Sequence, residues 1–209
     1  MRTLEIVVPT YNREDEIARF LKYAQKVESP EDWIVNINVR YGGKPEALTG
    51  IVNGLVGESS ADVVMVLADH LVMHSDCLLN CMGYFDDNSD LMVGLHIENL
   101  PITPGISEYC FFALDREFIS RFPDRQIFCP DYYHFYADNE LGKFANSIGK
   151  FYWAEDAKVT TYHPNVGNAS KDTTYWSSRK NVAQDKQANS IRKTKRFLWG
   201  RDFRLLGNG

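Results

Sequence analysis

Residues 61–76 read ADVVMVLADHLVMHSD, and this stretch decides the fold class. An apolar run at 63–67 stops at Asp69 and His70, and a second apolar trio follows at 71–73. The pattern is typical of a buried strand of a parallel sheet that carries two polar groups to its end. An unpaired carboxylate or imidazole is costly to bury, and ligands of open α/β sheets bind beyond the carboxyl ends of the strands. We therefore predict a functional site at Asp69 and His70; the alternative is a turn-capping Asp69 and an incidental surface His70.

Predicted strands and helices alternate around this stretch, regularly in the first half of the chain and less regularly in the second. Strands are expected at 4–8, 34–39, 63–67, 91–97, 109–114, 151–154 and 159–162, and helices after a capping Asn12, after Pro45, at 77–85 and at 137–148. The β-α-β-α-β order of the first half favours right-handed crossovers and a parallel, twisted sheet. The sequence thus predicts an α/β fold, Rossmann-like, with a mostly parallel twisted sheet flanked by helices.

Size and composition limit the classes of protein to which the chain could belong. With 209 residues, 44% of them hydrophobic, it can form one full α/β domain with a sizeable core. A net charge of −5 argues against attraction of the whole surface to nucleic acid or membrane. Neither GxGxxG after the first strand nor GxxxxGKS/T is present, which argues against a dinucleotide dehydrogenase or a P-loop enzyme.

The absence of targeting segments and the use of cysteine favour a cytoplasmic protein. No apolar run approaches the ~20 residues needed for a transmembrane segment, and the start of the sequence lacks the apolar segment and cleavage site of a signal peptide. The four cysteines, Cys77, Cys81, Cys110 and Cys129, lack the paired spacing of a zinc site. We expect free thiols in a reducing cytoplasm.

Three polar clusters and one histidine stand at predicted ends of strands or helices. The first cluster is the PTYN loop at 9–12, and the second is Asp69-His70. The third is the ADNEL segment at 137–141, and His163 follows the last predicted strand. Their positions at element ends favour a shared ligand site.

In this order the clusters resemble the motifs of family 2 glycosyltransferases of the GT-A fold. The first strand of that family typically ends in a motif like VVPTYNR, found here at 7–13. A later strand ends in a D-x-D type motif, and a helix opens with an acidic pair, as at 137–141. The resemblance covers about residues 4–165 and implies a single GT-A-type catalytic domain at 1–165. An extension at 166–209, polar and then basic, would pack on that domain or be tethered to it.

The resemblance implies an inverting, metal-assisted transferase that moves a hexose or pentose from a nucleotide-diphosphate sugar, first of all a UDP-sugar, to an acceptor hydroxyl. The implied donor contacts are Pro9, Thr10, Tyr11, Asn12, Arg40, Asn53 and Asp69. A divalent cation, Mn²⁺ or Mg²⁺, would be held by Asp69, His70 and His163, with direct contact to the diphosphate as the alternative for His163. Carboxylate and imidazole are suitable ligands for such cations, and the cation would neutralise the leaving diphosphate.

Asp138 matches the position of the family's catalytic base, which takes the proton of the acceptor hydroxyl. Tyr136 and Glu140 are the expected acceptor contacts, with a structural role as the alternative for Glu140. The helix dipole favours acidic residues in any first turn, so Asp138 and Glu140 could be helix-opening acids only. The aromatic cluster at 132–136 could stack on a sugar or base, or pack in the core.

Two departures from the family pattern keep a non-catalytic protein in consideration. His70 stands where the family most often has its metal-binding aspartate. The second strand, which normally ends in an aspartate that touches the nucleobase, ends here in VRYG at 39–42. The alternative to an enzyme is therefore a nucleotide-sugar or carbohydrate-binding module of the same fold that has lost turnover.

The basic C-terminal tail is the feature of the sequence that bears on the acceptor. Between residues 192 and 204 one acid, Asp202, stands among six basic residues: Arg192, Lys193, Lys195, Arg196, Arg201 and Arg204. The tail could make a peripheral contact with an anionic membrane, follow a phosphate backbone, or pack its aromatic residues on the catalytic domain. The acceptor is accordingly expected to be a glycan or, as in phage-type DNA-sugar transferases, a hydroxymethylated DNA base.

Overall fold

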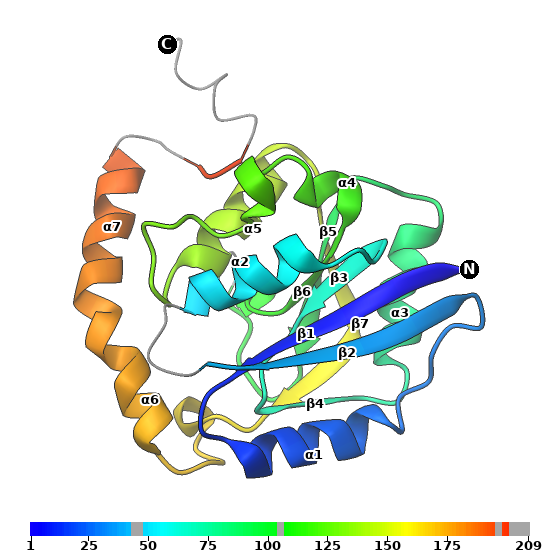
Figure 1. Ribbon diagram of the computed structural model, residues 1–209, viewed down its shortest axis with the longest axis horizontal. Coiled ribbons are helices and arrows are strands. Elements are labelled where there is room, and N and C mark those ends of the chain that lie inside the picture. Colours follow the sequence, from blue (N-terminus) through cyan, green and yellow to red (C-terminus); the bar gives the residue numbers. More distant parts are fainter. Residues whose placement is uncertain (43–47, 104–106, 195–197, 201–209) are drawn as a thin grey trace.

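The computed structural model describes residues 1–42, 48–103, 107–194 and 198–200, which form a seven-stranded sheet with helices on both faces (Figure 1). The strands stand in the order β2-β1-β3-β6-β5-β7-β4. They are β1 (Arg2–Thr10), β2 (Trp33–Tyr41), β3 (Val63–Val66), β4 (Leu71–Met73), β5 (Met92–Ile97), β6 (Phe112–Asp115) and β7 (Phe151–Thr161).

Most of these strands run in one direction. β1 is parallel to β2 and β3, and β5 is parallel to β7. β6 is antiparallel to both β3 and β5, and β4 is antiparallel to β7. β2, β1, β3, β5 and β7 therefore point the same way, so the predicted mostly parallel sheet is confirmed. The carboxyl ends of β1, β3, β5 and β7 consequently meet at one edge of the sheet.

Helices cover both faces because successive strand residues point to opposite sides of the sheet. In β1, Leu4 and Ile6 lie in one buried apolar cluster and Val7 lies in the other. The first cluster receives α1 (Glu14–Ala24) and α3 (Cys77–Asp86); the second receives α2 (Leu48–Glu58), α4 (Arg116–Ile119) and α5 (Ala137–Ser147). The helices predicted from the sequence are thus present as α1, α2, α3 and α5, whereas α4 was not predicted. Pro45, the predicted start of α2, lies outside the described residues.

Local predictions failed at three places. The stretch at 61–76 forms two strands rather than one, because β4 separates from β3 after the polar pair and joins β7 at the far edge of the sheet. The two strands predicted at 151–162 are one, β7, with an irregular register opposite β5. Asn12 does not cap α1, because Arg13 occupies the N-cap position and Asn12 has a φ of 51°.

The segment after β7 folds back along the sheet as α6 (Thr173–Ser178) and α7 (Val182–Thr194), on the left of Figure 1. Ala188 of α7, together with Leu198 and Trp199, packs against the second apolar cluster. Within the tail, Leu198 and Trp199 thus make the kind of contact expected if the tail packs on the domain, one of its three alternatives. No described helix has the length and apolar character to cross a membrane.

Candidate active site

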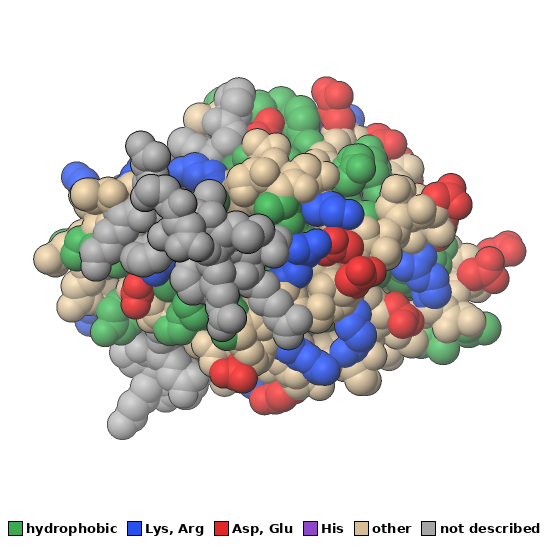
Figure 2. Space-filling view, turned by 90° about the horizontal axis from the view of Figure 1, so that it is seen from above, with side chains coloured by type: hydrophobic (Ala, Val, Ile, Leu, Met, Phe, Trp, Pro, Cys, Tyr) green, Lys and Arg blue, Asp and Glu red, His purple; other side chains and the backbone are tan. Residues whose placement is uncertain are grey.

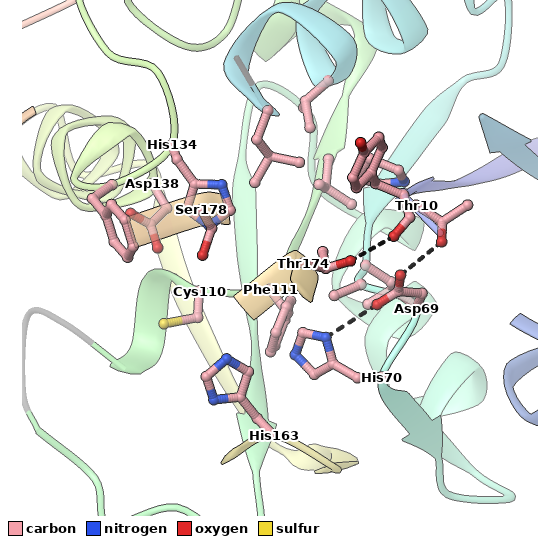
Figure 3. A pocket seen from close by; sticks show the side chains of 18 of the residues that line it. Thr10, Asp69, His70, Cys110, Phe111, His134, Asp138, His163, Thr174 and Ser178 are labelled. Carbon is pink, nitrogen blue, oxygen red and sulfur yellow. Dashed lines mark hydrogen bonds and ion pairs between the residues drawn. The ribbon is translucent and has the colours of Figure 1, made fainter. Parts of the chain in front are cut away.

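A cavity of about 630 Å³ opens at the sheet edge where the carboxyl ends of β1 and β3 approach the start of α5 (Figure 3). Its polar lining comes from segments 9–13, 66–70, 133–139 and 161–166, with a further wall from α6. Leu48, Ile51 and Val52 of α2 supply an apolar wall. A concave site with an apolar wall and a few converging polar groups is the usual form of a small-molecule site.

Asp69, between β3 and β4, is a buried carboxylate with several partners. Its Oδ2 accepts a hydrogen bond from Thr10 Oγ1 at 2.7 Å, and its Oδ1 accepts from His70 Nδ1 at 3.2 Å and from the Arg13 guanidinium at 3.3 Å. Burial acts to raise the pKa of Asp69, but the bonds from His70 and Thr10 and the charge of Arg13 outweigh it and lower that pKa. Asp69 is therefore ionised at neutral pH.

Asp69 orients His70 so that the other ring nitrogen is available. Because a carboxylate only accepts hydrogen bonds, the Nδ1 that faces Asp69 carries a proton, so that Nε2 is the acceptor in the neutral form of the ring. A carboxylate behind an imidazole in this way is the common support for a metal-binding histidine. In Figure 3 the His70 ring lies between Asp69 and His163, and the two imidazole centroids are 5.1 Å apart.

His163 follows β7 at the same edge of the sheet. Its Nδ1 accepts a hydrogen bond of 3.1 Å from the backbone N–H of Asn165, so the neutral ring carries its proton on Nε2. Burial, assisted by the neighbouring His70 and Arg13, lowers the pKa of His163 to about 4. A neutral ring with an Nε2–H favours the second of its two expected roles, donation of a hydrogen bond to an anionic ligand.

A metal ion at this site would need ligands from its substrate as well as from the protein. Within the described part of the chain, no group of three or more His, Cys, Asp or Glu side chains is arranged to hold a metal. Asp69, His70 and His163 are thus neighbours without forming a complete cage. Mg²⁺-type ions at phosphate substrates are usually held by one or two protein ligands, phosphate oxygens and water. Asp69 and the Nε2 of His70 fit that kind of site.

Asp138 lies in the first turn of α5, across the cavity from Asp69 in Figure 3. Burial raises the pKa of Asp138 to about 6, against hydrogen bonds from the Asn139 N–H and the Cys110 thiol that favour the charged form. Such a carboxylate is ionised at neutral pH and is still a useful proton acceptor. Tyr136, just before the helix, has a φ of 71°. This left-handed conformation is uncommon outside glycine and is often found at functional sites.

Most of the predicted site residues meet in this cavity. The residues of this group that line it are Pro9, Thr10, Tyr11, Asp69, His70, Tyr136, Asp138 and His163. They come from strand and helix ends that the sequence alone places at one edge of the sheet, which is why their position was predictable.

Three of the predicted donor contacts do not line the cavity. Asn12 is exposed to solvent. Arg40 forms an ion pair with Glu58. Asn53 makes two hydrogen bonds of 2.8 Å with the backbone of Phe128. Arg40 and Asn53 therefore connect neighbouring segments of the fold outside the cavity.

Glu140, predicted as an acceptor contact, does not line the cavity either. It is 7% exposed, and its carboxylate accepts hydrogen bonds from the Tyr132 hydroxyl at 2.8 Å and the Trp199 N–H at 2.7 Å. The Arg192 guanidinium donates two more, at 2.6 and 2.8 Å. These contacts support the structural alternative for Glu140.

Several cavity residues were missed by the sequence analysis. Arg13, the last residue of the VPTYNR motif, bridges Asp69 and Asp172. His134 belongs to the aromatic cluster at 132–136, and burial lowers its pKa to about 4. A wall of small polar residues at helical spacing, which could have signalled a helix face, consists of Thr174, Ser177, Ser178 and Asn181.

No protein-family model matches the sequence, and no curated protein matches it. Solved structures do match. The mannosyltransferase PcManGT from Pyrobaculum calidifontis, in complex with GDP-Man and Mn²⁺, superposes with a TM-score of 0.61 and 15% identity, over 90% of this chain and 64% of its own. A Drosophila galactosyltransferase 7, with manganese, UDP-Gal and xylobiose, gives 0.58 and 13%, over 78% and 71%. Glucosyl-3-phosphoglycerate synthase from Mycobacterium tuberculosis, with Mg²⁺ and UDP, gives 0.56 and 14%, over 90% and 79%.

These matches identify the fold of the chain as the GT-A fold of glycosyltransferases. The chain spans slightly less than two thirds of the length of the mannosyltransferase. At identities of 13–15% the likeness concerns the arrangement of the backbone, so the function has to be argued from the cavity itself.

Proposed function

We propose that this chain is a glycosyltransferase that moves a sugar from a nucleotide-diphosphate sugar to an acceptor hydroxyl, with inversion at the anomeric carbon. The observation that carries the proposal is the presence in one cavity of two different acidic sites. Asp138 is a partly buried carboxylate with a pKa of about 6, suited to removing a proton. Asp69 is an ionised carboxylate that orients His70, suited to anchoring a diphosphate. Membership of family 2 is part of this proposal and is supported by the motifs at 7–13 and 137–141.

The donor would lie along the carboxyl ends of β1 and β3. Its base would pack between the loop at 9–11 and the apolar wall of α2, and its diphosphate would reach His70 and the Nε2–H of His163. Structurally similar enzymes were solved with GDP-Man, UDP-Gal or UDP, which supports a nucleotide-diphosphate donor. A UDP-sugar is the first candidate.

The residues at the strand ends fit a divalent cation, Mn²⁺ or Mg²⁺, shared with the diphosphate. The Nε2 of His70 would be a protein ligand, and Asp69 would orient that ring. When bound, such a cation neutralises charge on the leaving diphosphate. The complexes of the similar enzymes with Mn²⁺ or Mg²⁺ support its use here.

Asp138 would act on the acceptor. Its carboxylate takes the hydroxyl proton as the acceptor oxygen forms a bond to the anomeric carbon. The bond between that carbon and the diphosphate breaks, and its electron pair stays on the diphosphate. Attack from the side opposite the leaving group inverts the configuration. Tyr136, which lines the same side of the cavity, would contact the acceptor.

A carbohydrate acceptor fits this chain better than a hydroxymethylated DNA base. The wall from α6 and the adjoining Asn181 presents uncharged hydroxyl and amide groups, which match sugar hydroxyls. Arg192, the first basic residue of the tail, is ion-paired with Asp131 and Glu140. Figure 2 shows acidic and basic side chains interspersed over the described part of one face. A phosphate backbone is instead bound by a continuous basic stripe.

The test is turnover of nucleotide sugars by the full chain. UDP- and GDP-sugars are screened with and without Mn²⁺ by thermal shift, because a bound ligand stabilises the fold by RT ln(1 + [L]/Kd). Donors that bind are assayed for nucleoside diphosphate release with glycoside acceptors. We expect Mn²⁺-dependent binding, and release that Asp138→Asn abolishes while binding remains. Binding without release in the unmodified protein would identify a non-catalytic module, and binding of no donor at all would overturn the proposal.

A further inference from the structure

Helix α7 carries one buried residue, the carboxylate Asp185, which is 0% exposed. It accepts hydrogen bonds from three consecutive backbone N–H groups, those of Tyr133 at 2.7 Å, His134 at 3.0 Å and Phe135 at 2.8 Å. Converging backbone N–H groups form an anion-binding nest, and a buried carboxylate requires such partners. The contact joins parts of the chain 50–52 residues apart.

The anchored N–H groups belong to the loop that precedes α5. Tyr133, His134 and Phe135 all line the cavity, and Asp138 follows in the first turn of the helix. Between them the backbone of Tyr136 adopts a φ of 71°. A backbone in this sparsely populated region persists only when its surroundings fix it. The three bonds to Asp185 supply that fixation immediately before the turn.

A second contact from α7 holds α5 on the other side of Asp138. Arg192, about two helical turns beyond Asp185, donates two hydrogen bonds to Glu140, at 2.6 and 2.8 Å. Glu140 lies in the same first turn as Asp138. Asp138 is therefore placed between two points of the chain that α7 anchors.

We propose that Asp185 is a positioning residue of the active site, which acts through the loop at 133–136 to hold His134 and Asp138 in the cavity. The catalytic part of this inference rests on the proposed transferase function, whereas the anchoring itself does not. Helix α7 is then a component of the catalytic unit. Because burial keeps His134 neutral, the loop presents an uncharged hydrogen-bonding ring to the substrate beside the ionised base.

The variant that tests this role is Asp185→Asn. It preserves the size of the side chain, but its amide nitrogen cannot accept a hydrogen bond, so at least one of the three N–H groups loses its partner. Amide hydrogen exchange at 133–135 should become at least about 10-fold faster, since exchange reports local opening. The kcat should fall about 10–100-fold, as misplacement of reacting groups by ~1 Å costs up to ~10²-fold. The acid limb of the kcat–pH profile, set by Asp138, should move below its parental position as the carboxylate gains water.

Asp90→Asn is the matched control. Asp90 is 6% exposed and paired with Arg121 and Lys150, and it does not line the cavity. This variant also removes a buried carboxylate, so it reports the effect of general destabilisation. Its kcat–pH profile and its exchange rates at 133–135 should stay parental.

Each outcome either supports or overturns the positioning role. Unchanged exchange at 133–135 in Asp185→Asn, or an unchanged kcat–pH profile despite faster exchange, overturns it. If Asp185→Asn does not fold, amide hydrogen exchange in the unmodified protein tests the anchoring. Amides at 133–135 that exchange as fast as those of exposed loops would then contradict it. If the unmodified protein shows no transfer, the proposed function fails, and a titration of Asp138 by NMR in both forms tests the positioning separately.

Discussion

Replacing Asp138 by Asn should stabilise the fold while it removes catalysis. Burial raises the pKa of this carboxyl from 3.8 to about 6, so the folded state pays a penalty for keeping the group ionised at neutral pH. A difference of about two pKa units corresponds to ~3 kcal/mol. Asparagine removes that penalty and can still accept the N–H of Asn139 through its Oδ1. It also loses the favourable interaction of a charge with the start of α5, up to ~1 kcal/mol. The expected net gain is ~2 kcal/mol, or a rise in Tm of roughly 4–8 °C.

The stability gained by Asp138→Asn should increase as the pH rises. Because the folded-state pKa of Asp138 lies above the unfolded value, the ionisation penalty is absent below pH 3.8, grows between pH 3.8 and about 6, and is complete above that. Calorimetry of both forms between pH 4 and 8 measures the difference. Asp90→Asn should show the opposite sign, although burial acts to raise the pKa of Asp90. Its hydrogen bond and ion pair with Arg121 and its contact with Lys150 outweigh burial and lower that pKa. Its loss should therefore destabilise the fold at neutral pH, and less so as the pH falls.

Asp138→Asn should also lose sugar transfer by about 10²–10⁴-fold at saturating donor and acceptor, with donor affinity retained. Two results would refute the reasoning. A Tm at pH 8 equal to or below that of the parent would show that the carboxylate is not desolvated. Transfer at near-parental rates would show that Asp138 is a helix-opening acid and not the catalytic base.

Three further changes test other parts of the site. Asp69→Asn should abolish Mn²⁺-dependent stabilisation by a nucleotide sugar in thermal-shift titrations. Asp172→Asn, in the same ion-pair cluster but outside the cavity lining, should retain it, and equal responses of the two variants would contradict the role of Asp69 at the metal and diphosphate site. Tyr11→Ala should raise the donor KM about 10-fold, equivalent to ~1.4 kcal/mol of lost binding, with a smaller change in kcat; an unchanged KM would place the nucleotide elsewhere. Glu140→Gln should lower the free energy of unfolding in urea by ~3 kcal/mol, because Arg192 loses a buried carboxylate partner; a loss of kcat at parental stability would return Glu140 to the acceptor site.

The sequence predicted those site residues whose place depends on where a strand or helix ends. Thr10 ends strand β1, and Asp69 and His163 follow strands β3 and β7; all three line the cavity. Asn53, expected as a donor contact, does not line the cavity, and its amide is bonded to the backbone of Phe128, 75 residues away. Whether a polar side chain faces a ligand or bonds to a distant segment depends on long-range contacts, which cannot be read from the neighbouring residues in the sequence.

The sequence by itself determined most of the strands and helices and their order, because the spacing of apolar residues is a local property that fixes which face of each element is buried. Only the tertiary structure decided that residues 71–73 leave β3 and pair with β7, since any apolar trio can complete either edge of a sheet. The tertiary structure alone also decided the partners and the ionisation of each buried carboxylate. The free energy of a carboxylate such as Asp138 or Asp185 is set by the water it loses and the donors it gains, and both are supplied by parts of the chain that meet only on folding.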